Sequence, residues 1–234
     1  MSSSYLERRE QLETYFDRTA ADAWSKLTSD APVSRIRATV RAGRDQMRAT
    51  LLSYLPEDLT GRRLLDAGCG TGALTLEAAR RGAEVVAIDL SQTLIDLARE
   101  RLAPQMQGLK IDFRVGDMLD ETLGEFDHVV AMDSLIHYPA SDIVRSIAAL
   151  AVRTSTSMVF TVAPSTPALE LMRFVGGFFP KGDRAPAIEP VRETELRERI
   201  AAESSLAQWE TSRTQKISSG FYKSQAFEVR RRKS

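Results

Sequence analysis

An aspartate followed by three closely spaced glycines is the first group of residues in this chain that could do chemistry. In LLDAGCGTG, residues 64–72, Asp66 stands two residues before Gly68, and Gly70 and Gly72 follow in alternation. Glycine lets the backbone turn sharply and lets a ligand approach it closely, and the start of the helix predicted next adds a partial positive charge. The carboxylate would repel a pyrophosphate but suits a cationic ligand. The turn therefore favours a cationic ligand, although GCGTGA also fits the dinucleotide pattern G-x-G-x-x-G/A.

Two further acids end the next two predicted strands. Asp89 stands 23 residues after Asp66 and can accept hydrogen bonds from both hydroxyls of a ribose. Gly116-Asp117-Met118 closes the third strand, where an acid beside a flat apolar side chain can hold an adenine. Together the three acids predict a site for a cation that carries an adenosyl group.

Residues 61–162 resemble the class I S-adenosylmethionine-dependent methyltransferases, because the D-x-G-x-G-x-G turn and both later acids occur together. The resemblance implies S-adenosyl-L-methionine as the cofactor and S-adenosyl-L-homocysteine as its product. It implies these cofactor-binding residues: Asp66, Gly68, Cys69, Gly70, Gly72, Asp89, Leu90, Gly116, Asp117, Met118 and Met132. Cys69 is interpreted as a small packing residue rather than a nucleophile, because no histidine is near it in sequence. A dinucleotide-dependent oxidoreductase remains an alternative.

Both histidines of the chain lie in FDHVVAMDSLIHYP, residues 126–139. Ligands of an open parallel sheet bind outside the carboxyl ends of its strands. His128 is near the amino end of its predicted strand, so we expect a rim or partly buried residue without a chemical role. His137 lies just past the carboxyl end and is the candidate for chemistry, with an ordinary loop histidine as the alternative. The chain lacks the [DN]-P-P-[YFW] motif of adenine and glutamine N-methyltransferases, which disfavours methylation of an exocyclic amine.

The apolar periodicity predicts a scaffold that alternates strands and helices. Strands are predicted at 62–67, 83–90, 109–115, 126–132 and 156–163, with helices at 73–81, 91–102 and 140–152. Two last strands, 208–217 and 221–230, follow one another around Ser218-Ser219-Gly220 and predict an antiparallel hairpin. The predicted fold class is α/β, a Rossmann-like class I methyltransferase fold with a mostly parallel seven-stranded sheet, a C-terminal antiparallel hairpin and a helical N-terminal arm.

The segments outside this alternation are interpreted as covers of the site. Helices predicted at 3–19 and 32–55 form an N-terminal helical arm or cap over residues 1–56, ahead of a cofactor-binding domain at 57–234. A proline-rich excursion at about 163–192 interrupts the alternation near the carboxyl edge of the sheet. Long excursions in compact domains are often lids or binding loops.

Composition narrows the function classes. The 32 basic and 32 acidic residues balance, so a general basic footprint for nucleic acid is absent. A single cysteine excludes a disulfide framework and a cysteine-based zinc site within one chain, and no metal site is predicted. The N-terminus has no apolar signal core and no apolar run reaches the ~20 residues of a membrane span. We therefore expect a cytoplasmic protein.

Three stretches resemble a narrower family. YFDRTAADAW at 15–24, DSLIHYP at 133–139 and LMRFVGGFFPKGDRAP at 171–186 are similar to the N-terminal arm, the motif after strand four and the lid of magnesium protoporphyrin IX methyltransferases. The resemblance runs nearly end to end, although the family arm often continues with Gly-Phe where this chain has Ala20-Ala21.

This family resemblance implies a reaction in chlorophyll and bacteriochlorophyll biosynthesis. A methyl group passes from S-adenosylmethionine to one propionate of magnesium protoporphyrin IX, which gives the monomethyl ester. The resemblance matches the family's arm tyrosine to Tyr15 and its catalytic histidine to His137. It also implies contact with the porphyrin-carrying subunit of magnesium chelatase.

A propionate is already ionised at neutral pH, since its reference pKa is near that of Glu, about 4.3. His137 therefore need not act as a base, and we expect Tyr15 and His137 to be hydrogen-bond donors that orient the acceptor oxygen. Tyr15 has the alternative role of an apolar anchor of the first helix. Phe174, Phe178 and Phe179 with Tyr138 are predicted to bind the flat macrocycle, with ordinary packing of a lid helix as the alternative.

Two basic features have no assigned chemistry. Arg37, Arg41, Arg44 and Arg48 recur at helical spacing and predict a solvated face, or else a site for a second propionate or an acidic partner. The RRRK run at 230–233 is interpreted as a frayed tail that would add about 1 kcal/mol per charge of attraction to anionic lipid. Peripheral association with the photosynthetic membrane is thus left open.

Two alternative hypotheses compete with that of a porphyrin carboxyl methyltransferase. One is a methyltransferase of the same fold that acts on another small apolar acceptor, such as a quinone precursor. The other is a protein that binds porphyrin or cofactor without turnover. The acids at the strand ends and His137 argue mildly against the second.

Overall fold

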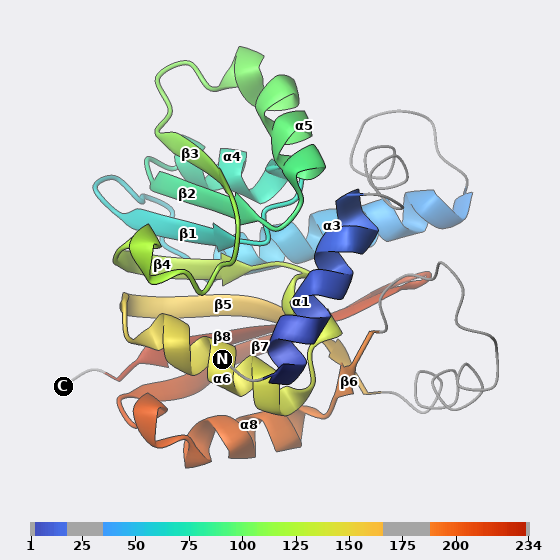
Figure 1. Ribbon diagram of the computed structural model, residues 1–234, viewed down its shortest axis with the longest axis vertical. Helices are drawn as coiled ribbons and strands as arrows, with labels where there is room; N and C mark the ends of the chain where they lie inside the picture. The colour runs from blue at the N-terminus through green and yellow to red at the C-terminus, as the bar shows by residue number, and fades with distance from the viewer. Residues whose placement is uncertain (1–2, 18–34, 166–187, 233–234) are drawn as a thin grey trace.

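One mixed sheet forms the centre of the molecule (Figure 1). The computed structural model describes residues 3–17, 35–165 and 188–232. The strands are β1 Arg63–Ala67, β2 Glu84–Asp89, β3 Ile111–Val115, β4 Phe126–Ala131, β5 Thr154–Pro164, β6 Pro190–Val191, β7 Trp209–Ser219 and β8 Tyr222–Arg231. Their order is β3-β2-β1-β4-β5-β8-β7, and β6 pairs with β5 beside this path. The pairs among β1 to β6 are parallel, whereas β8 runs antiparallel to both β5 and β7.

The helices are α1 Ser3–Tyr15, α3 Arg35–Ser53, α4 Ala73–Arg80, α5 Gln92–Leu102, α6 Ala140–Ala151 and α8 Glu193–Ala202. Of these, α4, α5 and α6 connect parallel strands as crossovers, whereas α1 and α3 precede β1 and α8 leads into the antiparallel hairpin. Ser91 is the N-cap of α5, because its Oγ accepts a hydrogen bond from the backbone N–H of Leu94 at 3.2 Å. Strand order reverses at β1, where β2 lies on one side and β4 on the other, and a ligand crevice is expected at this switch point.

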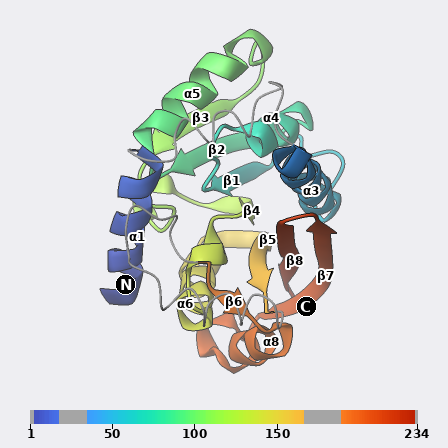
Figure 2. The same ribbon diagram turned by 90° about the vertical axis from the view of Figure 1, so that its right-hand side faces the viewer.

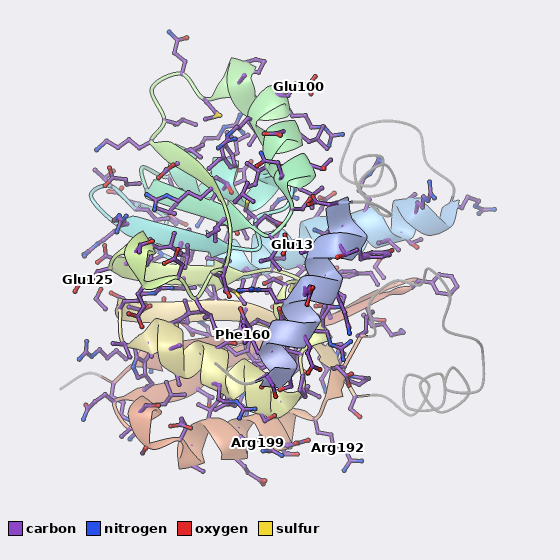
Figure 3. The ribbon with its side chains drawn as sticks, in the orientation of Figure 1. Glu13, Glu100, Glu125, Phe160, Arg192 and Arg199 are labelled. Atoms are coloured by element: carbon purple, nitrogen blue, oxygen red, sulfur yellow. The ribbon has the colours of Figure 1, made fainter. Side chains whose placement is uncertain are left out.

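The two faces of the sheet have separate cores. Successive strand residues point to opposite faces, so Leu64 packs in the cluster of α3, α4 and α5, while Leu65 packs in the cluster of α1, α6 and α8. Figure 2 shows α1 and α3 on opposite sides of the sheet. The central strands are buried on both faces, and Phe160 of β5, labelled in Figure 3, stacks on Phe227 of β8 with 5.8 Å between ring centroids. This packing ties the antiparallel hairpin to the parallel part of the sheet.

The predicted fold class is confirmed, with differences at its margins. The first predicted helix, 3–19, is helical over the described residues 3–17, and the second, 32–55, is helical over 35–53. Neither β6 nor α8 was predicted. The only large apolar side chains of α8 are Leu196 and Ile200, both buried, and two positions make too weak an apolar stripe to recognise in a highly charged segment.

The interpretation of RRRK as a frayed tail is wrong for residues 230–232. Arg230 and Arg231 belong to β8, and Arg230 forms an ion pair with Glu210 at 2.9 Å. The backbone N–H of Arg232 donates to the carbonyl oxygen of Gln208 at 2.8 Å. Pairing with β7 extends the strand beyond the apolar pattern that predicted it.

Among the described residues no helix combines the length and apolar character needed to cross a membrane.

Candidate active site

The glycine turn after β1 has a backbone that only glycine adopts easily. Gly68, Gly70 and Gly72 have φ values of 85°, 54° and 77°, in the left-handed region. The N–H groups of Gly68 and Cys69 both donate to the carbonyl oxygen of Ile88, at 2.8 and 3.0 Å, which joins the turn to the end of β2. A Cβ atom on Gly68 would lie 2.5 Å from that of Ser134. The turn therefore packs directly against the loop that follows β4.

Asp66 is a buried acid directly beneath this turn. It is 1% exposed, and its Oδ2 accepts a hydrogen bond from the Thr75 hydroxyl at 2.6 Å. Burial raises the pKa of Asp66 to about 7; the bond from Thr75 opposes the rise and the nearby charge of Asp89 adds to it. A positive charge next to the carboxyl would lower this pKa again. The site is thus suited to a cation.

Asp89 connects the glycine turn to the start of α5. Its Oδ2 accepts from the N–H of Gly70 at 2.8 Å, and its Oδ1 accepts from the N–H of Ser91 at 3.0 Å. Burial raises the pKa of Asp89, while these two backbone bonds oppose the rise. Asp17, just beyond α1, accepts from the Ser91 hydroxyl at 2.5 Å. The end of the first helix therefore lies beside the predicted ribose-binding acid.

Asp117, the predicted adenine-binding acid after β3, is held by the first helix. The hydroxyl of Tyr5 donates to its Oδ1 at 2.7 Å, and Arg9 forms an ion pair with its Oδ2 at 3.0 Å. The backbone N–H of Leu119 also donates to Oδ1, at 2.9 Å. Sequence reasoning missed Tyr5 and Arg9, because nothing in a charged helix at the start of the chain marks which strand end it will cover. Figure 1 shows α1 lying along the edge at which the parallel strands end.

The other predicted cofactor residues surround these acids. Met118 and Met132 are 8% and 9% exposed, Leu90 packs against the cluster under α1, and Gly116 has a φ of 149°. Cys69 packs against the cluster of α3, α4 and α5. Burial, and then the nearby acids, raise the pKa of its thiol well above the usual value, so it is a poor nucleophile.

The two predicted catalytic residues lie at the same edge. His137 ends the short 3₁₀ turn η4, Leu135–His137, and is buried at 8% exposure. Phe16 meets its ring edge-on with 6.3 Å between centroids, and the ring of Tyr15 meets Phe16 at 5.2 Å. Tyr15 itself is half-buried, while the buried residues of α1 are Tyr5 and Leu12. These contacts bring the end of the first helix to the histidine turn.

The arrangement fits S-adenosylmethionine. Three acids end three adjacent strands, the most buried of them has a raised pKa, and the glycine turn leaves room for close approach of a ligand to the backbone. A ligand that matches this site carries a positive charge, ribose hydroxyls and a base with an amino group. The comparisons with known proteins agree with this geometry.

Two family models match the chain. Residues 131–231 match the C-terminal part of magnesium-protoporphyrin IX methyltransferases, and residues 64–154 match a general methyltransferase domain. A magnesium-protoporphyrin O-methyltransferase of Rhodobacter capsulatus is 50% identical over 231 residues, which cover 98% of this chain and 100% of that protein. The chain belongs to the magnesium-protoporphyrin O-methyltransferase family.

A solved structure and a relative from another pathway are also similar to this chain. The crystal structure of magnesium protoporphyrin IX methyltransferase from Synechocystis with bound S-adenosylhomocysteine superposes with a TM-score of 0.80 at 27% identity, covering 96% of this chain and 100% of that one. A ubiquinone biosynthesis O-methyltransferase of Xanthomonas oryzae is 33% identical over 168 residues, which cover 70% of this chain and 66% of that protein.

His128 lies in the first half of β4, away from the carboxyl edge of the sheet, and it is fully buried rather than at the rim. It is 3% exposed, and its Nδ1 lies 2.8 Å from the Ser157 hydroxyl. Burial lowers its pKa, so the ring is neutral at pH 7. A groove of about 770 Å³ beside it is lined in part by Arg213 and Glu228, which form an ion pair at 2.7 Å. This groove lies at the amino ends of β4 and β5, whereas the methyl-transfer site is expected at the carboxyl ends of the parallel strands.

The predicted substrate residues are placed only in part. Phe174, Phe178 and Phe179 lie outside the described residues. Tyr138 is 2% exposed and stacks on Tyr5 with 5.0 Å between centroids, so in this conformation it packs beneath α1 rather than lining an open surface.

The end of the predicted excursion is anchored beside the histidine turn in this family member. The backbone N–H of Glu189 donates to the carbonyl oxygen of Ile136 at 2.9 Å, and the Glu189 carboxylate forms an ion pair with Arg8 at 3.0 Å. The N–H of Ser165 donates to the carbonyl oxygen of Val191 at 3.0 Å. Both ends of the excursion therefore meet at the carboxyl edge of the sheet.

The arginine stripe is not simply solvated. Arg44 forms an ion pair with Asp133, and its side chain is 18% exposed. Arg48 pairs with Asp45 at 2.9 Å on the helix surface. The expectation of a solvated face is wrong for Arg44, because α3 packs against the start of β8 and turns this residue towards the loop after β4. Asp133 is the first residue of the motif DSLIHYP, but no feature of the sequence predicts its left-handed backbone.

Proposed function

We propose that this chain transfers the methyl group of S-adenosylmethionine to a propionate carboxylate of magnesium protoporphyrin IX, which yields the monomethyl ester and S-adenosylhomocysteine in (bacterio)chlorophyll biosynthesis. The observation that carries the proposal is the end-to-end 50% identity to a magnesium-protoporphyrin O-methyltransferase. The three acids at the ends of β1, β2 and β3 support it, because they fit the methyl donor.

The chain's own residues have two tasks in this reaction. Asp66, Asp89 and Asp117 hold the donor, with Leu90, Met118 and Met132 against its apolar parts. The bound donor supplies an electrophilic methyl group on a positively charged sulfur. The acceptor carboxylate is ionised at neutral pH, since a propionate has a pKa of about 4.3. No base is needed, and the protein must instead align oxygen, carbon and sulfur, which accounts for up to about 7–11 kcal/mol in well-oriented reactions.

Exclusion of water contributes a second effect. The attacking carboxylate and the sulfonium neutralise each other as the bond forms, so a dry site favours the transfer once both ions are held. In our proposal His137 and Tyr15 donate hydrogen bonds that orient the acceptor, and Phe174, Phe178 and Phe179 cover the macrocycle. The buried position of His137 beside Phe16 supports this role, because a donor shielded from water keeps its direction.

We further propose that this chain contacts a protein partner and a membrane surface. The family resemblance supports contact with the porphyrin-carrying subunit of magnesium chelatase, which would deliver the poorly soluble macrocycle, and peripheral association with the photosynthetic membrane. Analytical ultracentrifugation of the two purified proteins with porphyrin, and flotation with anionic vesicles, would detect these contacts. Sedimentation as separate species in the first experiment would contradict the partner, and absence of the chain from the floated vesicles would contradict membrane association.

Ester formation tests the central proposal. The purified chain is incubated with S-adenosylmethionine labelled in its methyl group, with magnesium protoporphyrin IX, and separately with a catechol quinone precursor. Chromatography with mass detection should show the labelled porphyrin monomethyl ester. The quinone precursor is the relevant competitor because of the 33% identical ubiquinone-pathway relative. Transfer to the quinone precursor alone, or porphyrin binding without any transfer, would overturn the proposal.

A further inference from the structure

Asp133 has an unusual backbone for its residue type. Among the described residues it is the one non-glycine position with a positive φ, 58°. Bulkier side chains rarely adopt this left-handed region, and aspartate does so at an energetic disadvantage. Backbone outliers of this kind persist only where surrounding contacts impose them, and they concentrate at functional sites. Asp133 follows Met132 directly, at the end of β4.

Three separate elements hold this residue. Its carboxylate is ion-paired with Arg44 of α3 and accepts from the hydroxyl of Tyr222 of β8 at 3.0 Å. The hydroxyl of Thr161 on β5 accepts from the Asp133 N–H at 2.7 Å and donates to its Oδ1 at 3.3 Å. The Asp133 side chain is 5% exposed. Burial, and then the charge of Asp133, raise the pKa of Tyr222, so its phenol stays protonated and remains a donor.

The hairpin tip is fitted to α3 so that these donors converge. A Cβ atom on Gly43 would lie 2.6 Å from the ring of Tyr222, so only glycine lets that ring reach across the helix. The hydroxyl of Ser219 donates to the carbonyl oxygen of Thr39 at 2.8 Å, which anchors the hairpin to the same helix. The hairpin and α3 together therefore aim Tyr222 and Arg44 at one carboxylate.

The next residue is held on the opposite side. The left-handed turn at Asp133 directs Ser134 towards β1, where its hydroxyl donates to the carbonyl oxygen of Ala67 at 2.8 Å and its Cβ packs on Gly68. The segment that leads to His137 is thus fixed between the glycine turn and the wall formed by α3 and β8. A loop of this kind would otherwise move relative to the sheet.

We infer that Asp133 is a positioning residue for methyl transfer: held by Arg44, Tyr222 and Thr161, it fixes the turn 134–137 against the glycine turn and so sets the direction of His137. This inference rests on the proposed function, in which His137 orients the acceptor. It goes beyond that function, because it assigns roles to a carboxylate, an arginine of the basic stripe and a hairpin tyrosine to which the proposed function assigns none. A displacement of about 1 Å in such a group is enough to lower turnover about a hundredfold.

The chain offers a direct spectroscopic test, because it has only two histidines, one within β4 and one in the turn that follows it. In protein labelled in its histidine rings, Asp133→Asn should shift or broaden the His137 resonances and leave those of His128 unchanged. The matched control is Asp127→Asn, which also removes a charge paired with an arginine, Arg62 at 3.2 Å. It should disturb His128 and leave His137 unchanged. An unaltered His137 spectrum in Asp133→Asn would overturn the inference, whatever the substrate proves to be.

Kinetics test the consequence for turnover. Asp133→Asn should lower kcat about tenfold to a hundredfold, with the Kd for S-adenosylhomocysteine changed less than about threefold. In a His137→Ala background the same substitution should lower kcat less than about twofold, since residues that act through one another are not additive. Equal effects in both backgrounds would mean that Asp133 acts independently of His137. If Asp133→Asn does not fold, Tyr222→Phe removes a single hydroxyl and should show the same pattern with a loss of about threefold to tenfold.

The outcomes separate the two proposals. Absence of ester from the wild-type chain would contradict the proposed function, and the histidine spectra would still decide the positioning role. Ester formation with an unchanged His137 spectrum in Asp133→Asn would contradict the positioning role alone.

Discussion

Tyr5 donates a hydrogen bond to Asp117 at 2.7 Å, across 112 positions of sequence. The contact joins the first helix to the acid predicted to bind adenine, and the same tyrosine ring stacks on Tyr138 beside the histidine turn. Burial raises the pKa of Tyr5, so the phenol remains a donor at neutral pH. The first helix therefore contacts both the predicted adenine-binding acid and the residues beside the histidine turn.

The Tyr5→Phe substitution removes this donor and keeps the ring. A hydrogen bond to a charged group contributes about 1.5–3 kcal/mol, so the free energy of unfolding should fall by about that amount. The affinity for S-adenosylhomocysteine should fall severalfold, because Asp117 loses one of the contacts that orient it. Denaturant unfolding and calorimetry measure both quantities. Tyr54→Phe, at the opposite edge of the sheet beside Arg213, is the control and should leave the affinity unchanged; an equal loss in both variants would contradict a specific role.

Asp66 should make cofactor binding depend on pH. Its pKa is about 7 in the free protein, whereas a cationic ligand favours the ionised carboxylate. Binding near pH 6 should therefore release a proton, and the affinity should fall as pH decreases below 7. Calorimetry in buffers of different ionisation enthalpy detects the release. Asp66→Asn should bind more weakly and release no proton, and an unchanged proton release in that variant would contradict the assignment.

The same carboxyl affects stability with a definite sign. Its folded pKa of about 7 lies above the value of about 3.9 for an unfolded aspartate. The folded state therefore binds the proton more tightly, so this contribution to stability is fully present below pH 4 and is lost as pH rises through 7. Comparison of wild type with Asp66→Asn by denaturant unfolding between pH 4 and 8 isolates the contribution. A difference between the two proteins that does not change with pH would contradict it.

Gly68 and Gly61 form a matched pair that separates backbone strain from close packing. Both have left-handed φ values, 85° and 72°, but a Cβ on Gly61 would meet nothing within 4 Å, whereas one on Gly68 would strike Ser134. Gly61→Ala should cost about 1–2 kcal/mol of stability from the backbone alone. Gly68→Ala should cost about 1–3 kcal/mol more through overpacking and should weaken cofactor binding. Denaturant unfolding gives both values, and equal costs would show that the loop after β4 yields easily.

His137→Ala should lower kcat about tenfold to a hundredfold, as expected when an orienting group is lost, and leave the affinity for S-adenosylhomocysteine within about twofold. The control is His128→Ala, which lies away from the site. It should keep kcat and instead reduce stability by about 1–3 kcal/mol, because it leaves the buried Ser157 hydroxyl without its partner. Ester formation and thermal unfolding distinguish the two. Unchanged turnover in His137→Ala would remove this histidine from the mechanism.

Much of the site could be predicted because its elements are local in sequence. The glycine turn, its helix and the acids at the strand ends each follow from a few adjacent residues and a known strand direction. The contacts of Tyr5, Arg44 and Asp133 could not be predicted in this way. Each depends on how a helix far away in sequence packs against the sheet, and residue type and spacing alone do not reveal that packing.

The amino-acid sequence by itself determined the alternation of strands and helices, the hairpin, the cation-suited turn and the family. These features depend on periodicity and backbone preference, which act over a few residues. Only the tertiary structure decided that the first helix binds Asp117, that Arg44 faces inward, and that Asp133 adopts a left-handed backbone. The physical reason is that a buried carboxylate needs donors, and which donors reach it depends on the packing of the whole chain around the sheet.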